Sequence, residues 1–331
     1  MQHITYTRAV TAEAAVAAFS EAGEGARYIA GGTTLYDLMK LGIERPKHLI
    51  DLSGIDGLQD IEEANGALRI GAMALMSDVA RSVADTYPVL AESLEKAASQ
   101  QLRNMATVGG NLLQRTRCPY FRAGSDLYPC NKLSPGSGCA AQEGHDRAQA
   151  VLGASAECNA VAPGDWPIAL VALDARIELR GPDGSRGIGV PELYQLPGTT
   201  PEREFSLRPG EIVTAVVIPE TAAARASTYH KIRDRESYAF ALASAAVALA
   251  MEGDTIREAR IAVGGVATRP WRAAEAEALL TGQPFTRSLA EQAGAAAFEG
   301  ATPGRENAYK IDLGASVVAD ALEIAFERSR A

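Results

Sequence analysis

The fold of this chain is decided by the stretch Tyr28-Ile29-Ala30-Gly31-Gly32-Thr33-Thr34-Leu35, where a short apolar strand meets two glycines, two hydroxyl side chains and the start of a helix. A second glycine pair stands in Ala106-Thr107-Val108-Gly109-Gly110-Asn111-Leu112. Backbone N–H groups at such turns point outward and carry partial positive charge, which suits a pyrophosphate. One such turn alone is better explained as an ordinary strand–helix connection, whereas two together favour a dinucleotide held from both sides. Neither turn is G-x-G-x-x-G or a P-loop, so nothing supports nicotinamide or ATP binding.

Around the first glycine pair, strand and helix signals alternate. The predicted elements are strands at residues 3–6, 28–30 and 48–52 and helices at residues 12–21 and 35–41, with Thr11 as the N-cap of the first helix. We predict an α+β protein. Residues 1–221 form one domain, divided into a small α/β subdomain (1–57) and a larger subdomain (58–221). A polar linker at residues 220–226 leads to an α+β C-terminal domain (225–331).

Composition narrows the class of function. The chain has 331 residues and a formal net charge of −9, which does not suit a protein that binds nucleic acid through phosphate contacts. The longest apolar run, residues 240–251, is shorter than the roughly 20 residues that span a bilayer. We predict a buried helix there, although periodicity alone also allows a strand. The N-terminus shows no secretory signal, so the chain's own sequence predicts a cytoplasmic location, with a periplasmic one open if a signal-bearing partner exports the complex.

All four cysteines gather in one region, with the pattern Cys118-x11-Cys130-x8-Cys139-x18-Cys158. Structural zinc sites and thioredoxin-like sites use closely spaced cysteine pairs, and this chain has none. Iron–sulfur clusters need four thiolates, tolerate irregular spacing and often have prolines beside the cysteines, as at Pro119 and Pro129. The pattern favours a metal or cluster site, while disulfides or unrelated buried thiols remain alternatives. The segment 115–158 is too long and too rich in turn residues for an ordinary loop.

Two further charged residues are candidate cofactor ligands. Asp165 stands in a turn ahead of a helix, where its carboxylate could accept a ribose hydroxyl, and Lys231 lies in a strand, where it could neutralise a reduced flavin. On sequence alone, contact with solvent explains each of them better. Nothing in the sequence nominates a catalytic nucleophile or base.

The two glycine stretches, with Gln101-Leu102-Arg103-Asn104 ahead of the second, resemble the FAD loops of the medium subunit of molybdenum hydroxylases, the family of xanthine dehydrogenase and carbon monoxide dehydrogenase. The resemblance covers nearly the whole chain. It implies a two-subdomain FAD-binding domain of the vanillyl-alcohol-oxidase (PCMH) type and a C-terminal domain of the carbon monoxide dehydrogenase flavoprotein type. The segments Arg117-Cys118-Pro119-Tyr120-Phe121-Arg122 and Gly136-Ser137-Gly138-Cys139-Ala140-Ala141 resemble the [4Fe–4S] insertion of bacterial periplasmic-type aldehyde oxidoreductase FAD subunits.

The resemblance also assigns residues. The first FAD loop would consist of Ala26, Arg27, Tyr28, Ile29, Ala30, Gly31, Gly32, Thr33 and Thr34. The pyrophosphate would also be held by Thr107, Gly110 and Asn111, the ribose or adenine end by Asp165, and the flavin by Lys231. The cluster ligands would be Cys118, Cys130, Cys139 and Cys158.

The function that follows from the resemblance is electron transfer within a heterotrimer. A large subunit would carry the molybdenum cofactor, a small subunit two [2Fe–2S] clusters, and this chain would pass their electrons to an external acceptor, in an aldehyde oxidoreductase. The alternatives are the FAD subunit of a 4-hydroxybenzoyl-CoA reductase-like or other molybdenum hydroxylase, a stand-alone flavin oxidase, and a scaffold without cofactors.

Overall fold

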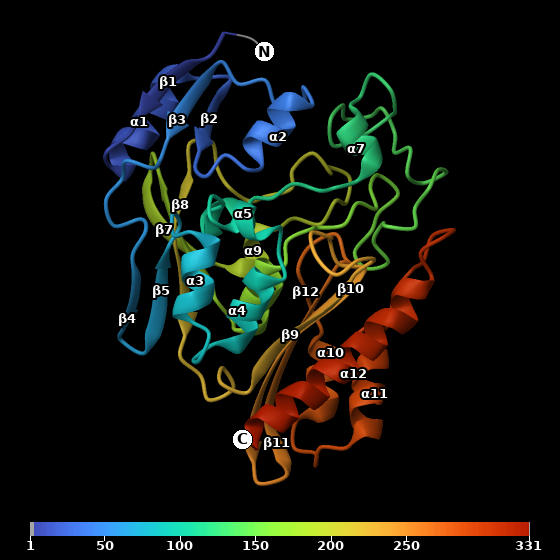
Figure 1. The fold of residues 1–331 in the computed structure, drawn as a ribbon. Helices are drawn as coiled ribbons and strands as arrows, with labels where there is room; N and C mark the ends of the chain where they lie inside the picture. The colour runs from blue at the N-terminus through green and yellow to red at the C-terminus, as the bar shows by residue number, and fades with distance from the viewer. Residues whose placement is uncertain (1–2, 331) are drawn as a thin grey trace.

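The computed structural model describes residues 3–330 as three β-sheets with helices packed between and around them (Figure 1). The outer limits of the predicted domains, residues 1 and 331, lie outside the described residues. Within residues 3–330, no helix combines the length and apolar character needed to cross a membrane.

The N-terminal unit has the predicted alternation of strands and helices. Its elements are β1 (Thr5–Arg8), α1 (Ala12–Ala22), β2 (Ala26–Ile29), α2 (Leu35–Lys40) and β3 (His48–Asp51), and its parallel three-stranded sheet has the order β1-β3-β2. The hydroxyl of Thr11 accepts a hydrogen bond from the Ala14 N–H at 3.0 Å, which caps α1 as predicted. The parallel arrangement brings the C-terminal end of β2, and therefore the first glycine pair, to an edge that faces the rest of the molecule (Figure 1).

The central unit is an antiparallel five-stranded sheet of order β4-β5-β8-β6-β7 with helices against it. Its strands are β4 (Ile61–Ala64), β5 (Ala67–Gly71), β6 (Arg176–Gly181), β7 (Gly184–Gly189) and β8 (Ile212–Pro219). Its helices are α3 (Met76–Ser82), α4 (Pro88–Glu95), α5 (Gln100–Arg103), α6 (Val108–Leu112), α8 (Trp166–Ala172) and α9 (Val190–Leu193).

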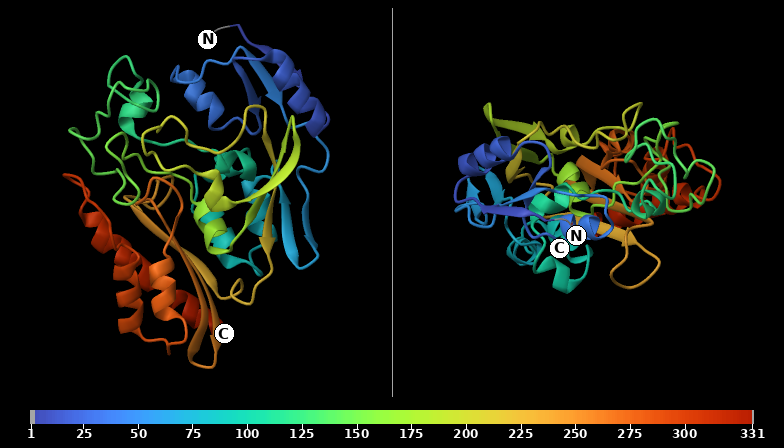
Figure 2. Two further views of the ribbon diagram at one scale, coloured as in Figure 1. Left: turned by 180° about the vertical axis from the view of Figure 1, so that it is seen from behind. Right: turned by 90° about the horizontal axis from the view of Figure 1, so that it is seen from above.

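The C-terminal unit is a four-stranded antiparallel sheet of order β12-β11-β10-β9, with α10 (Ala274–Leu280), α11 (Arg287–Ala296) and α12 (Tyr309–Ser329) on one side (Figure 2). Its strands are β9 (Ser227–Ile232), β10 (Ala243–Glu252), β11 (Thr255–Gly264) and β12 (Trp271–Arg272). The other face of this sheet packs on α4 and α8 of the central unit.

The predicted helix at residues 240–251 is wrong, because most of this run is strand β10. Both neighbours of β10 are hydrogen-bonded to it, β9 on one side and β11 on the other. Successive side chains enter different cores: Ala246 and Ala248 face the central unit, whereas Val247 and Leu249 face the C-terminal helices. A strand buried on both faces needs apolar residues at every position, so it shows no polar alternation.

The insertion predicted at residues 115–158 has one short helix, α7 (Pro119–Ala123), and otherwise consists of turns and isolated bridges such as Cys130↔Cys139. It lies beside α2, and a small core joins the two, with Leu38 of α2 packed against Phe121 and Cys130 (Figure 1). The insertion thus contacts the helix that begins directly after the first glycine pair.

Candidate functional site

The first glycine loop presents a row of free backbone donors. Within residues 3–330, the N–H groups of Gly31, Gly32, Thr33 and Thr34 donate no hydrogen bond to a backbone or side-chain acceptor. Gly32 has a φ of +72°, a left-handed conformation that glycine adopts without strain. Consecutive N–H groups in such a turn form a concave anion-binding surface. The loop therefore fits a pyrophosphate.

The second loop lies directly against the first. A Cβ on Gly31 would come within 1.9 Å of the Met105 carbonyl oxygen, so only glycine permits this approach. On the second loop, the Thr107 hydroxyl caps α6 by accepting the Gly110 N–H at 3.2 Å. The side-chain oxygen of Asn111 is buried without a hydrogen-bond partner among the described residues. Because a buried carbonyl oxygen without a donor is costly, Asn111 fits a ligand that supplies one.

The other predicted residues of the first loop are engaged with the protein. The Arg27 guanidinium donates to Glu44 at 2.9 Å, and the Tyr28 hydroxyl donates to the Gly210 carbonyl at 2.8 Å. Burial raises the pKa of Tyr28, so its hydroxyl stays protonated. Ala26 is buried, and Ile29 ends β2. These side chains fix the position of the loop and leave its backbone to meet a ligand.

Asp165 and Lys231 form one buried network, whereas the sequence suggested separate roles for them. The Lys231 ammonium lies 2.9 Å from Asp165 Oδ2, and the side chains are 1% and 6% exposed. The Tyr229 hydroxyl donates to Asp165 Oδ1 at 2.5 Å and accepts from the Ser244 hydroxyl at 2.9 Å. Burial raises the pKa of Asp165, against the opposing effects of Lys231 and Tyr229. Gly164, just before Asp165, lies close to the Asn111 carbonyl, so this network adjoins the second loop.

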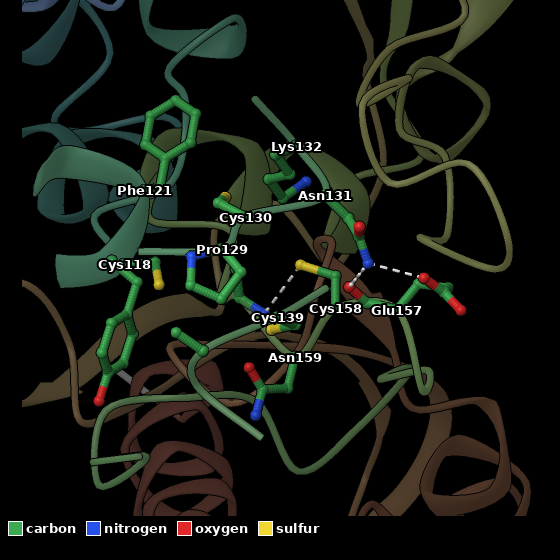
Figure 3. A pocket seen from close by; sticks show the side chains of 13 residues that line it. Cys118, Phe121, Pro129, Cys130, Asn131, Lys132, Cys139, Glu157, Cys158 and Asn159 are labelled. Carbon is green, nitrogen blue, oxygen red and sulfur yellow. Dashed lines mark hydrogen bonds between the residues drawn. The ribbon is translucent and has the colours of Figure 1, made fainter. Parts of the chain in front are cut away.

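The four cysteines line one pocket between α7, the turns of the insertion and the segment 157–160 (Figure 3). Among the described residues, all four are free thiols, which rules out the disulfide alternative in this structure. The pocket is also lined by Tyr120, Phe121, Pro129, Asn131, Lys132, Ala140, Glu157, Asn159 and Ala160. Cys118 stands at the N-cap position of α7.

Backbone N–H groups act to lower the pKa of every cysteine. Those of residues 120 and 121 act on Cys118, those of residues 132 and 133 on Cys130, and those of residues 141 and 142 on Cys139, so these three cysteines repeat the same local pattern. Cys158 accepts the N–H of residue 160 at 3.4 Å. Such donors stabilise thiolates, and hydrogen bonds to sulfur are among the factors that set the potential of iron–sulfur clusters.

The thiols differ in acidity. Burial raises the pKa of Cys118 and of Cys130 above the ordinary range. The pKa of Cys139 is lowered to about 6, first because the Cys158 thiol donates to it, and further by N–H groups such as that of Asn159. The same contact raises the pKa of Cys158. Cys139 is therefore the thiolate of this pair.

Four thiols that line one pocket are the kind of donor set that an iron–sulfur cluster uses. Within residues 3–330, no group of three or more His, Cys, Asp or Glu side chains is placed to hold one metal ion. A tetrahedral zinc site with Zn–S bonds of about 2.3 Å brings its sulfurs within roughly 4 Å of one another. A cluster puts several irons and sulfides between its thiolates, so its ligands line a wider space than those of one ion.

Sequence reasoning missed the side chains that hold these turns. Asn131 donates to the Glu157 carboxylate at 2.6 Å and accepts the Gly138 N–H at 2.8 Å, which joins the turns of Cys130, Cys139 and Cys158. Gln149 donates to the Cys118 sulfur at 3.4 Å. These contacts join separate turns and leave no local pattern in the sequence.

Family models match almost the whole chain. The FAD binding domain in molybdopterin dehydrogenase matches residues 2–221, and the CO dehydrogenase flavoprotein C-terminal domain matches residues 227–325. The chain belongs to the family of FAD-binding subunits of molybdopterin dehydrogenases. The family resemblance and the fold predicted from it are thereby confirmed.

Individual relatives support the same family assignment. The chain is 46% identical over 332 aligned residues to the aldehyde oxidoreductase FAD-binding subunit of Escherichia coli, with 97% of this chain and 99% of that protein covered. It is 29% identical to the carbon monoxide dehydrogenase medium chain of Afipia carboxidovorans, with 98% and 96% covered. The solved structure of carbon monoxide dehydrogenase from Hydrogenophaga pseudoflava matches with a TM-score of 0.76 at 27% identity, covering 99% of this chain and 98% of that chain. The protein is an FAD-binding oxidoreductase subunit.

Proposed function

We propose that this chain is the FAD and [4Fe–4S] subunit of a heterotrimeric, molybdenum-containing aldehyde oxidoreductase. In this role it takes electrons from a [2Fe–2S] subunit and passes them to an external acceptor. The likeness over full length to a protein named as an aldehyde oxidoreductase FAD-binding subunit supports the class of enzyme. The observation that supports the cluster is one pocket lined by four free thiols, with backbone N–H groups that act to lower the pKa of each.

The chain's own residues hold and orient the cofactors. The N–H groups of residues 31–34 would receive the pyrophosphate, and Asn111 would accept a donor from the ligand. The Asp165–Lys231 ion pair fixes a dipole in the region beside the second loop. FAD, when bound, supplies the exchange between two-electron and one-electron steps, and the protein tunes it through such charges.

The cluster site would be held by Cys118, Cys130, Cys139 and Cys158. Phe121 and Pro129 cover it with apolar surface, and Lys132 places a positive charge beside it that lowers the pKa of Cys130 and Cys158 against the effect of burial. Positive charge and N–H donors both favour the thiolate forms that iron requires.

Iron and flavin content test the proposal. The chain is co-expressed with its neighbouring subunits and purified under anaerobic conditions. We expect one FAD and about four irons per chain beyond those of the [2Fe–2S] subunit, with an electron paramagnetic resonance signal of a reduced [4Fe–4S] cluster. Flavin without this iron contradicts the cluster, and the absence of both cofactors contradicts the whole proposal. Absence of an aldehyde-dependent bleaching of the flavin, with both cofactors bound, contradicts the proposed reaction.

A further inference from the structure

A chain of alternating charges runs from the first FAD loop to the cysteine pocket. Arg27 of the loop lies 2.9 Å from Glu44, and Glu44 lies 3.3 Å from Arg115. Arg115 lies 2.5 Å from Glu204, whose other oxygen lies 3.1 Å from Lys132. Lys132 lines the cysteine pocket. These ion pairs therefore connect Arg27, a residue predicted for the first FAD loop, with Lys132, which lines the cysteine pocket.

The ion pairs in the middle of this row of charges are largely shielded from water. The side chains of Glu44, Arg115, Glu204 and Lys132 are only 16%, 19%, 13% and 10% exposed. Because screening by solvent is weak there, removal of one member leaves a poorly solvated charge without its partner. The Arg115 guanidinium also lies 4.7 Å from the centre of the Phe121 ring, the wall of the pocket in α7. Its planar guanidinium pairs with the carboxylates of Glu44 and Glu204 at once, which a lysine ammonium does less well.

A second connection runs parallel to the first. Asp37 of α2 accepts hydrogen bonds from Arg117 at 2.7 Å and from Arg122 at 2.8 Å, and these arginines lie on either side of Cys118 in the sequence. Arg122, and then Arg117, hold the pKa of Asp37 below its usual range, so the carboxylate stays charged. Leu38 packs in the same small core as Cys130 and Phe121. Helix α2 is thus attached both to the FAD loop and to two of the cysteine turns.

These contacts imply that the two cofactor sites are mechanically connected. A cluster bound to Cys118 and Cys130 would restrain both turns, and with them Asp37 of α2 and the side chain of Arg115. Restraint of α2 in turn pre-organises residues 31–34, whose N–H groups must point in one direction to bind a pyrophosphate. A site that is already ordered loses less entropy on binding.

We propose, building on the cofactor assignment above, that Arg115 is a positioning residue that links the two sites. An iron–sulfur cluster in the insertion tightens FAD binding, and bound FAD slows loss of the cluster. The linkage is reciprocal, as it must be for any two binding equilibria on one molecule. Arg115 touches neither cofactor; it acts through Glu44 on the FAD side and through Glu204 and Lys132 on the cluster side.

The test compares FAD affinity in cluster-loaded and iron-free forms of the full chain, kept in complex with its co-expressed subunits. FAD is removed by dialysis against a chaotropic salt, iron is removed from one half with a chelator, and FAD binding is followed by flavin fluorescence. We expect the loaded form to bind FAD about fivefold more tightly or better, the lower end of typical couplings. In Arg115→Gln this ratio falls towards one. The rate of iron transfer to a chelator, which FAD slows in the wild type, becomes independent of FAD.

Arg287→Gln is the matched control. Arg287 also bonds several carboxylates, those of Glu291, Asp320 and Glu323, but it lies on α11, away from both sites, and its variant keeps the wild-type ratio. If Arg115→Gln does not fold, Glu44→Gln removes the ion pair with Arg115 on the FAD side. The ratio of FAD affinities between the cluster-loaded and iron-free forms is then measured for that variant. A wild-type ratio of one with both cofactors bound, or an unchanged ratio in these variants, overturns the linkage alone. A wild type that never binds iron overturns the linkage together with the cluster.

Discussion

The close approach of Gly31 to the backbone of Met105 predicts that a single added methyl group weakens FAD binding. In Gly31→Ala, the new Cβ would lie 1.9 Å from the Met105 carbonyl oxygen and 2.8 Å from its carbonyl carbon. Both are backbone atoms, so no side chain can rotate away. The loops must separate by roughly 1 Å to restore an ordinary contact, and such overpacking costs about 1–3 kcal/mol. The separation moves the N–H groups of residues 31–34 relative to Asn111.

The expected result is at least a tenfold loss of FAD affinity. A hydrogen bond to a charged group contributes about 1.5–3 kcal/mol, and about 1.4 kcal/mol corresponds to a factor of ten, so loss of one pyrophosphate contact suffices. Affinity is measured by fluorescence titration, with circular dichroism to verify the fold. The matched control is Gly187→Ala in β7, where the nearest atoms lie at 3.6 Å and beyond. Wild-type FAD affinity in a folded Gly31→Ala protein would refute the assignment of this loop.

Three further predictions concern other buried groups. Cys158→Ser should lose iron but still bind FAD, with the weaker affinity of the iron-free form, because Cys158 lines the cysteine pocket and not the glycine loops. Iron content and flavin content are measured on one sample with excess FAD, and full iron content would contradict the ligand assignment. Asp165→Asn should destabilise the fold by about 3–5 kcal/mol in denaturant unfolding, since it leaves the Lys231 cation buried without its counter-charge; the double variant with Lys231→Met should recover part of the loss, and simple additivity would contradict the pairing. Burial lowers the pKa of Lys310 to about 8, so between pH 8 and about 10 the unfolded chain binds more protons than the folded one. The free energy of unfolding therefore rises with pH in this range, by at most about 1.4 kcal/mol per pH unit. Lys310→Met should lose this rise, and identical pH profiles of the variant and the wild type would contradict the prediction.

Local signals in the sequence were enough to predict most of the N-terminal unit. The Thr11 cap, the alternation of strands and helices, and the glycine turn are all determined within a few residues. The run at residues 240–251 was misassigned because alanine favours helices and the run lacks alternation. Only its two neighbouring strands and the two cores on either side make it a strand, and these partners are distant in the sequence.

Two strands of the central sheet were not predicted, because their positions also depend on neighbouring strands. β4 has the sequence Ile-Glu-Glu-Ala and β7 the sequence Gly-Ser-Arg-Gly-Ile-Gly, and they form the two edges of the central sheet. An edge strand has one hydrogen-bonded neighbour and a large exposed surface, so its residues need not be apolar or β-branched. Its position is determined by the strand beside it rather than by its own composition.

In the candidate site, too, local features could be predicted from the sequence and contacts between distant residues could not. The backbone donors of residues 31–34 follow from a local turn, and the sequence indicated them. The pairing of Asp165 with Lys231 joins residues 66 positions apart, and the contact of Arg115 with Glu204 joins residues 89 positions apart. Each of these side chains alone looks like an exposed charge. Their burial, and hence their energetic weight, appears only once the chain is folded.

The cysteine spacing was informative because it matched no short motif. Zinc knuckles place two ligands on one turn, which fixes their separation to a few residues. Here Cys118, Cys130 and Cys139 each head a separate turn that supplies N–H donors from the second and third residues after the cysteine. Because each turn stabilises its own thiolate, the number of residues between the turns is free to vary, provided that other contacts assemble them. Asn131 and the carboxylate of Glu157 provide such contacts, so the irregular spacing and the long-range polar network have one physical origin.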